Sequence, residues 1–146
     1  MQRKDKALQL FSNRHNCSQA VFAAFRQADV LDEASALRLA TMFGGGLAGA
    51  GGGMCGAVSG ALMAISMRFG MGGIGELANK TKTYELGRQF MAEFEKRIGS
   101  CRCESILGLN IGEPESLQKA RELKLFETIC VDAVGTACDI LEEMEM

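Results

Sequence analysis

The sequence has one histidine, one proline and no run in which apolar and polar residues alternate as they do in a strand. Without such alternation or a hairpin dipeptide, nothing in the sequence predicts a β-sheet. No C-x-x-C-H motif occurs, which excludes attachment of a c-type haem. No C-x-x-C pair occurs either, and this argues against a structural zinc site, because such sites usually draw their ligands from close pairs. The formal net charge is only -2 and no long run of like charges is present, so we expect neither nucleic acid nor an anionic membrane as a partner.

The first six residues are mostly polar or charged and do not form the apolar core of a signal peptide. We therefore expect a cytoplasmic protein. In a reducing compartment, cysteines are better explained by redox chemistry, metal binding or packing than by permanent disulfides. The chain has six of them: Cys17, Cys55, Cys101, Cys103, Cys130 and Cys138.

Glycine is abundant, and it is concentrated between Gly44 and Gly60. Such a run is typical of a loop that needs positive φ angles or a close approach of another group. We interpret it as a tight loop that delivers Cys55 to the first turn of a central, uncharged helix. Gly56 and Gly60 would give this helix a surface of small residues against which neighbouring backbones can pack.

This region has two further features, each of which suggests another interpretation. No charge lies between Arg38 and Arg68, as in a membrane span, but the glycines interrupt the apolar run. The segments 44–49 and 51–56 each match G-x-G-x-x-G, as in a dinucleotide-binding loop. No strand-like segment precedes either match and no P-loop lysine follows, so we favour neither interpretation.

Helical periodicity elsewhere predicts an all-α fold, a single domain over residues 1–146 with about six or seven helices packed around the glycine-rich loop and the Cys55 helix. Asn16 and Gln19 form a capping box for the second helix. Besides the Cys55 helix, the expected segments are Arg3–Arg14, Cys17–Ala28, Ala34–Met42, Glu76–Ile98, a single turn at Cys103, Glu115–Phe126 and Ile129–Met144.

Four cysteines, Cys17, Cys55, Cys103 and Cys130, fall at the start of predicted helices. The positive end of the helix dipole favours an anion there, so we expect these thiols to be more acidic than an ordinary cysteine. A thiolate is the nucleophile of disulfide exchange and also a metal ligand, so the pattern supports both chemistries.

The remaining candidates have simpler explanations. We expect Cys138 to be a core residue and Cys101 an incidental thiol. His15, two residues before Cys17, could act as a base or hold the Cys17 thiolate, but a histidine at a helix end is more often a solvated or capping residue.

The segment Cys55–Gly60 reads C-G-A-x-x-G, the motif of a family of redox-active proteins, C_GCAxxG_C_C, named after four cysteines in a set order. The chain resembles this family over nearly its whole length. The segment 16–21 is similar to its first cysteine segment, 99–108 to its third, and Cys130 to its fourth cysteine, while Cys101 and Cys138 are extra. The resemblance implies an α-helical protein with a redox role.

Three functions remain open. In the first, Cys17, Cys55, Cys103 and Cys130 perform reversible thiol–disulfide chemistry, as in a thiol–disulfide oxidoreductase or an electron-transfer protein, with no cofactor and with a partner protein or small thiol. In the second, the same four thiolates hold zinc or an iron–sulfur cluster. In the third, the protein is a non-catalytic helical interaction protein whose cysteines are core residues. Four cysteines allow three pairings, and the sequence does not choose among them.

Overall fold

A computed structural model describes all 146 residues and confirms an all-α fold without strands. The elements are α1 (Arg3–Ser12), α2 (Cys17–Phe25), α3 (Glu33–Ala40), the 3₁₀ turn η1 (Thr41–Phe43), α4 (Gly56–Phe69), the 3₁₀ turn η2 (Ile74–Glu76), α5 (Leu77–Ile98), α6 (Cys103–Leu107), α7 (Pro114–Glu122) and α8 (Ile129–Glu143).

The number of helices and several boundaries differ from the prediction. The predicted helix Cys17–Ala28 ends at Phe25, because Arg26 has an extended backbone, and the predicted helix Ala34–Met42 gives way to the 3₁₀ turn η1 after Ala40. The count is eight rather than six or seven, because the turn predicted at Cys103 is a five-residue helix, α6. The helices α1 and α7 end earlier than expected, because Arg14 and Lys124 have positive φ angles of 73° and 56°, which a right-handed helix does not accommodate.

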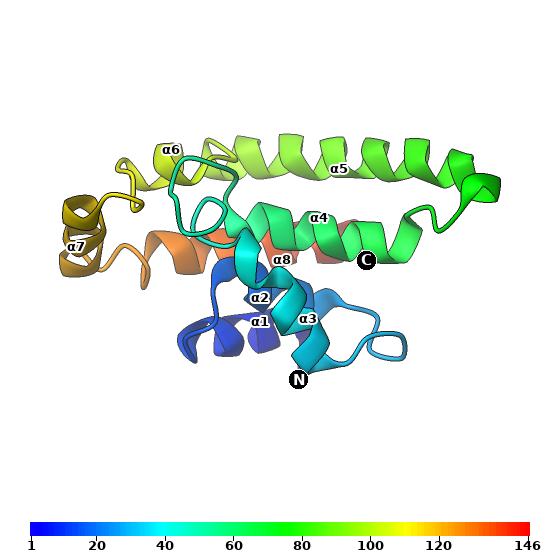
Figure 1. Ribbon diagram of the computed structural model, residues 1–146, viewed down its shortest axis with the longest axis horizontal. Coiled ribbons are helices and arrows are strands. Elements are labelled where there is room, and N and C mark those ends of the chain that lie inside the picture. The colour runs from blue at the N-terminus through cyan, green and yellow to red at the C-terminus, as the bar shows by residue number, and fades with distance from the viewer.

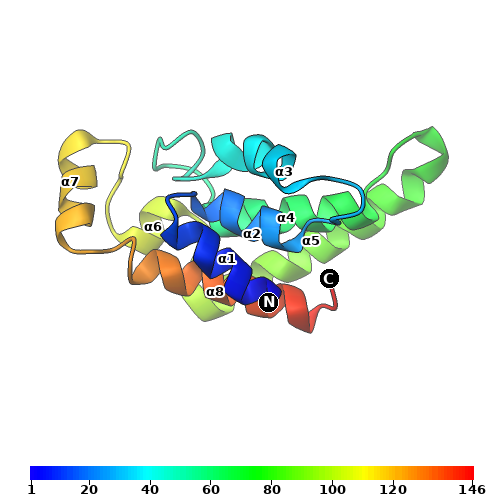
Figure 2. The same ribbon diagram turned by 90° about the horizontal axis from the view of Figure 1, so that it is seen from below.

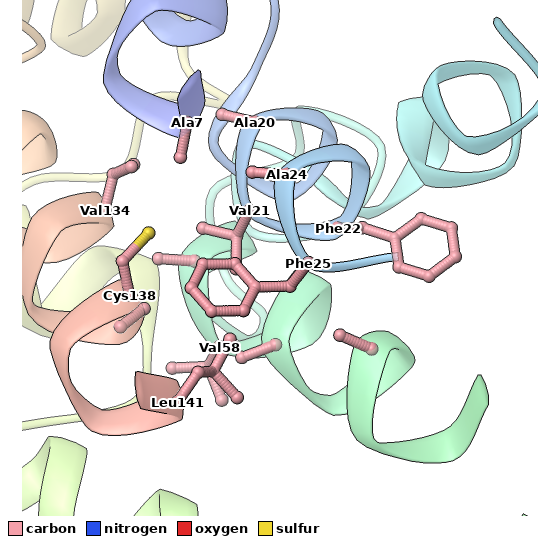
Figure 3. Close-up of a cluster of buried hydrophobic side chains, with 14 of the residues drawn as sticks. Ala7, Ala20, Val21, Phe22, Ala24, Phe25, Val58, Val134, Cys138 and Leu141 are labelled. Atoms are coloured by element: carbon pink, nitrogen blue, oxygen red, sulfur yellow. The ribbon is translucent and has the colours of Figure 1, made fainter. Parts of the chain in front are cut away.

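The α4 helix is the centre of the bundle, as predicted. It contacts α2, α5 and α8, while α1 packs on α2 and α8 (Figures 1 and 2). The core, which we call the main cluster, contains 25 buried residues, most of them from these helices and two, Ala36 and Ala40, from α3. Figure 3 shows Ala7, Val21, Phe25, Val58 and Leu141 converging from α1, α2, α4 and α8.

The close approach of α2 to α4 depends on small residues. A Cβ atom added to Gly60 would lie 2.6 Å from the carbonyl oxygen of Ser18, closer than real Cβ contacts come. Ala57 and Ala61, on the same helix, are completely buried. The predicted small-residue surface on α4 is therefore the one that faces α2.

A second, smaller core lies at one end of the molecule. This satellite cluster has four buried residues, Cys103, Leu107, Ile111 and Ala120, with partly buried side chains from α7 and the start of α8 around them. The helices α6 and α7 make few contacts with the other helices, and Figure 2 shows α7 standing at one end of the bundle.

The structure also bears on the membrane interpretation. No single helix has both the length and the hydropathy for a membrane crossing; α4 and the segment Ile74–Ile98 satisfy these criteria only when taken together, and they are bent by 106° relative to each other.

Candidate functional site

The loop before Cys55 is wound in the left-handed sense. Five consecutive residues have positive φ angles, 62°, 73°, 70°, 55° and 68° for residues 45 to 49. Gly45 and Gly46 adopt the left-handed conformation without a steric penalty, whereas the same conformation at Leu47 and at Ala48 destabilises the fold by about 1–2 kcal/mol per residue. Because no strand precedes this loop, the G-x-G-x-x-G matches lack the context of a dinucleotide site.

Backbone hydrogen bonds join this loop to the start of α6. The Cys55 N–H donates to the Cys101 carbonyl at 2.7 Å, and the Cys103 N–H donates to the Gly53 carbonyl at 2.9 Å. The Arg102 guanidinium adds a hydrogen bond to the Gly52 carbonyl at 3.0 Å. Cys55 and Cys103, far apart in sequence, are therefore held at one crossing of the chain.

All four predicted cysteines lie at helix starts. Cys17 is the first residue of α2, Cys55 is the N-cap of α4, Cys103 is the first residue of α6 and Cys130 is the second residue of α8. The capping box before Cys17 is confirmed, with hydrogen bonds of 2.9 and 2.8 Å between Asn16 and Gln19.

These four cysteines line one cavity of about 1280 Å³, together with Gly45 and Gly56. Cys55 is buried in the main cluster and Cys17 packs against that cluster, while Cys103 is buried in the satellite cluster and Cys130 packs against it. The cavity therefore lies where the two clusters meet, with two thiols from each side.

Gly56 leaves the space that the Cys17 thiol occupies. A Cβ atom added to Gly56 would lie 2.2 Å from Cys17 Sγ and 2.9 Å from the Ser18 nitrogen. The sulfur of Cys17 is thus packed directly against the first turn of α4, immediately after Cys55.

The expected lowering of thiol pKa values is wrong for three of the four cysteines. Burial raises the pKa of Cys103 to about 11 and that of Cys130 to about 12, and it also raises the pKa of Cys55. At Cys55 the N–H groups of Ala57 and Val58 act in the predicted direction, but desolvation of the thiolate outweighs them.

A charge on Cys17 further raises the pKa of Cys55, Cys103 and Cys130. Cys17 is therefore close enough to interact electrostatically with all three other thiols. Because like charges oppose one another in a buried site, the cavity favours a single thiolate at a time.

The other two cysteines lie outside this cavity. Cys138 is completely buried in the main cluster, which confirms its prediction as a core residue. Cys101 is partly buried, and its thiol donates a hydrogen bond to the Met91 carbonyl at 3.6 Å.

The cavity includes polar residues that sequence reasoning either left open or missed. His15 lines it, with its Nδ1 atom 3.1 Å from the Leu10 carbonyl oxygen. Arg14 and Arg121 also line it, from the α1–α2 connection and from α7. The two arginines line one cavity only because α7 and the α1–α2 connection both border it, and no local motif carries that information.

The arrangement of side chains does not match the metal-site alternative. No group of three or more His, Cys, Asp or Glu side chains is arranged so that it could hold a metal ion. All six cysteines are free thiols in this structure. The arrangement thus gives no support to the zinc or iron–sulfur alternative.

A comparison with protein families finds a match over most of the chain. The sequence model of C_GCAxxG_C_C, described as "Putative redox-active protein", matches residues 15–144. The chain belongs to this family. No curated protein and no solved structure matches the chain.

Membership in the C_GCAxxG_C_C family confirms the resemblance seen in the sequence. The structure gives a physical reason for both glycines of the C-G-A-x-x-G segment, since Gly56 makes room for the Cys17 thiol and Gly60 for the backbone of α2. The chain has six cysteines rather than the four in the family's name, and four of the six share the cavity.

Proposed function

We propose that this member of the C_GCAxxG_C_C family performs reversible thiol–disulfide exchange, with Cys17 as the central thiol and Cys55, Cys103 and Cys130 as its partners. The observation that carries the proposal is the lining of one cavity by these four thiols, with Cys17 Sγ packed against the residue that follows Cys55. Family membership supports a redox role in general.

Three features support Cys17 as the attacking thiol. It is only partly buried, it is the first residue of a nine-residue helix, and its sulfur packs against Gly56, next to Cys55. The N-terminal end of a helix stabilises a thiolate, and the thiolate is the species that attacks a disulfide.

The proposed reaction has two exchange steps. The Cys17 thiolate attacks one sulfur of an external disulfide, which forms a mixed disulfide and releases one thiolate. A second cavity thiol then loses its proton and attacks the Cys17 sulfur; we assign this step to Cys55, because the next residue, Gly56, packs against Cys17 Sγ. The protein gains one disulfide, and the external disulfide is reduced to two thiols that take up the two protons.

The test is a count of free thiols. Reduced protein is treated with an excess of a simple disulfide, counted, reduced again and recounted. We expect free thiols to be lost in pairs, with Cys101 and Cys138 retained, and to be fully recovered on reduction. In the Cys17→Ser variant the first pair of thiols should no longer be oxidised, whereas Cys138→Ser, a matched change outside the cavity, should behave as the wild type.

Two results would overturn the proposal. One is the absence of any reversible change in thiol count. The other is a Cys17→Ser variant that changes only in stability and keeps the wild-type thiol titration, as a non-catalytic protein would. Circular dichroism of each variant separates a lost reaction from a lost fold, and Cys17→Ala provides a second substitution without a hydroxyl group.

A further inference from the structure

The cavity is larger and more apolar than four thiols require. Its volume of about 1280 Å³ is at least that of ordinary small-molecule sites, which occupy about 300–1,000 Å³. Apolar side chains from several elements form its walls, among them Leu8, Phe11, Ile106, Leu107, Leu117 and Phe126. A wall of this kind suits an organic ligand with an apolar body.

Two unpaired cations add a second property. Arg14 and Arg121 line the same cavity, both are exposed, and neither takes part in any of the five ion pairs of the structure. Glu127 is the one carboxylate in the lining, and His15 is the remaining titratable side chain apart from the thiols. Two guanidinium groups against one carboxylate leave an excess of positive charge beside the apolar walls.

We propose that the cavity binds a low-molecular-weight disulfide, or the corresponding dithiol, that carries an apolar body and an acidic group; this identification rests on the thiol–disulfide function proposed above. The apolar body lies against the walls, and the acidic group pairs with Arg14 and Arg121, whose guanidinium geometry matches a carboxylate or phosphate. The sulfur atoms of the ligand then face the four thiols.

The exchange with such a ligand is balanced without a further reactant. The ligand's S–S bond breaks, and its two sulfurs take up two electrons and two protons from two protein thiols, between which a new S–S bond forms. In the reverse direction a dithiol ligand reduces the protein disulfide and becomes a disulfide itself.

Binding is tested first, without redox chemistry, on the reduced wild-type protein. Octanoate provides an apolar chain with a carboxylate, and octanamide is its neutral match. Calorimetric titration at low ionic strength should show that octanoate binds more tightly than octanamide. The Arg14→Gln/Arg121→Gln double variant should bind octanoate more weakly, by about threefold for each arginine, as expected for exposed ion pairs. Its affinity for octanamide should be unchanged. Arg88→Gln, on an exposed part of α5 outside the cavity, is the control.

The redox arm measures how fast the oxidised protein is reduced by dihydrolipoate, a dithiol with an aliphatic chain and a carboxylate, and by the neutral dihydrolipoamide. We expect dihydrolipoate to react faster and this advantage to disappear in the double variant but persist in Arg88→Gln. Circular dichroism verifies that the variants are folded.

The outcomes separate the two proposals. Reversible oxidation by a simple disulfide, with no preference for the acidic ligand in either arm, overturns the ligand class and leaves the thiol–disulfide function in place. Binding of octanoate that depends on the arginines, in a protein that never forms a reversible disulfide, overturns the function and supports a binding site for an apolar acid. Equal binding of octanoate by the wild type and the double variant also overturns the ligand class.

Discussion

The two hydrophobic clusters of this protein differ in size and in how they are held. The main cluster has 25 buried residues, most of them from helices that pack on one another, whereas the satellite cluster has four, around α6 and α7, which make few contacts with the other helices. The candidate site takes two thiols from each cluster. Half of the site therefore lies on well-packed helices, and we expect the other half, on the satellite cluster, to open at a smaller cost in free energy.

The largest effect should come from a change inside the main cluster. Phe90 is completely buried in α5, and replacing it by alanine leaves a cavity there, so we expect Phe90→Ala to lower the free energy of unfolding by about 3–5 kcal/mol. Chemical denaturation followed by circular dichroism measures this. Tyr84→Ala, an exposed aromatic residue on the same helix, is the control and should cost far less. A loss for Phe90→Ala as small as that of the control would contradict the assignment of the main cluster as the source of stability.

The second effect concerns the contact between α2 and α4. Gly60→Ala places a methyl group against the Ser18 carbonyl and must push α2 away from α4, so we expect a loss of about 1–3 kcal/mol. Gly75→Ala is the matched control, because a Cβ atom there meets nothing within 4 Å. Equal denaturation midpoints for the two variants would show that α2 and α4 are not packed at this distance in solution.

A change in the satellite cluster should have a more local effect. Leu107 is buried in α6, and we expect Leu107→Ala to lower the opening free energy of α6 and α7 by about 2 kcal/mol while α4 keeps its protection. Hydrogen exchange measured by mass spectrometry compares the segment 114–122 with the segment 56–69. The exposed Leu123→Ala serves as the control. If both segments lost protection equally, the two clusters would be a single cooperative unit.

The smallest effect is a dependence on pH. Burial raises the pKa of Cys103 from an ordinary value near 9.0 to about 11, so the folded state binds this proton more tightly than the unfolded state does. The contribution of the protonated Cys103 thiol to the free energy of unfolding is therefore fully present below pH 9.0 and is lost as the pH rises towards 11. Denaturation at several pH values should show stability falling over this range, and less steeply for Cys103→Ala than for the wild type. An identical slope would indicate that Cys103 is not desolvated.

The sequence was informative where the signal is local. Apolar periodicity predicts most helices, the Asn16–Gln19 pair predicts the start of α2, and the glycine run predicts a close approach beside Cys55. The left-handed winding that ends α1 and α7 early depends on the φ angles of Arg14 and Lys124, residues that give no sign of it in the sequence.

The prediction that was wrong and the site residues that were missed both depend on tertiary structure. Helix position alone suggested more acidic thiols, yet the pKa of a thiol also depends on its burial, which no motif reports. Arg14 and Arg121 become neighbours of the same cavity only when α7 is placed, although they are far apart in the sequence.

The backbone bonds between the glycine loop and the start of α6 have a consequence for synthesis. Cys17 and Cys55 leave the ribosome with the helices that carry them, whereas Cys103, which hydrogen-bonds to the Gly53 carbonyl, and Cys130 emerge much later. During translation the first two sulfurs lack the hydrophobic cover that α6, α7 and α8 supply. The nascent chain therefore passes through an interval in which Cys17 and Cys55 are exposed to solvent before Cys103 and Cys130 have been synthesised.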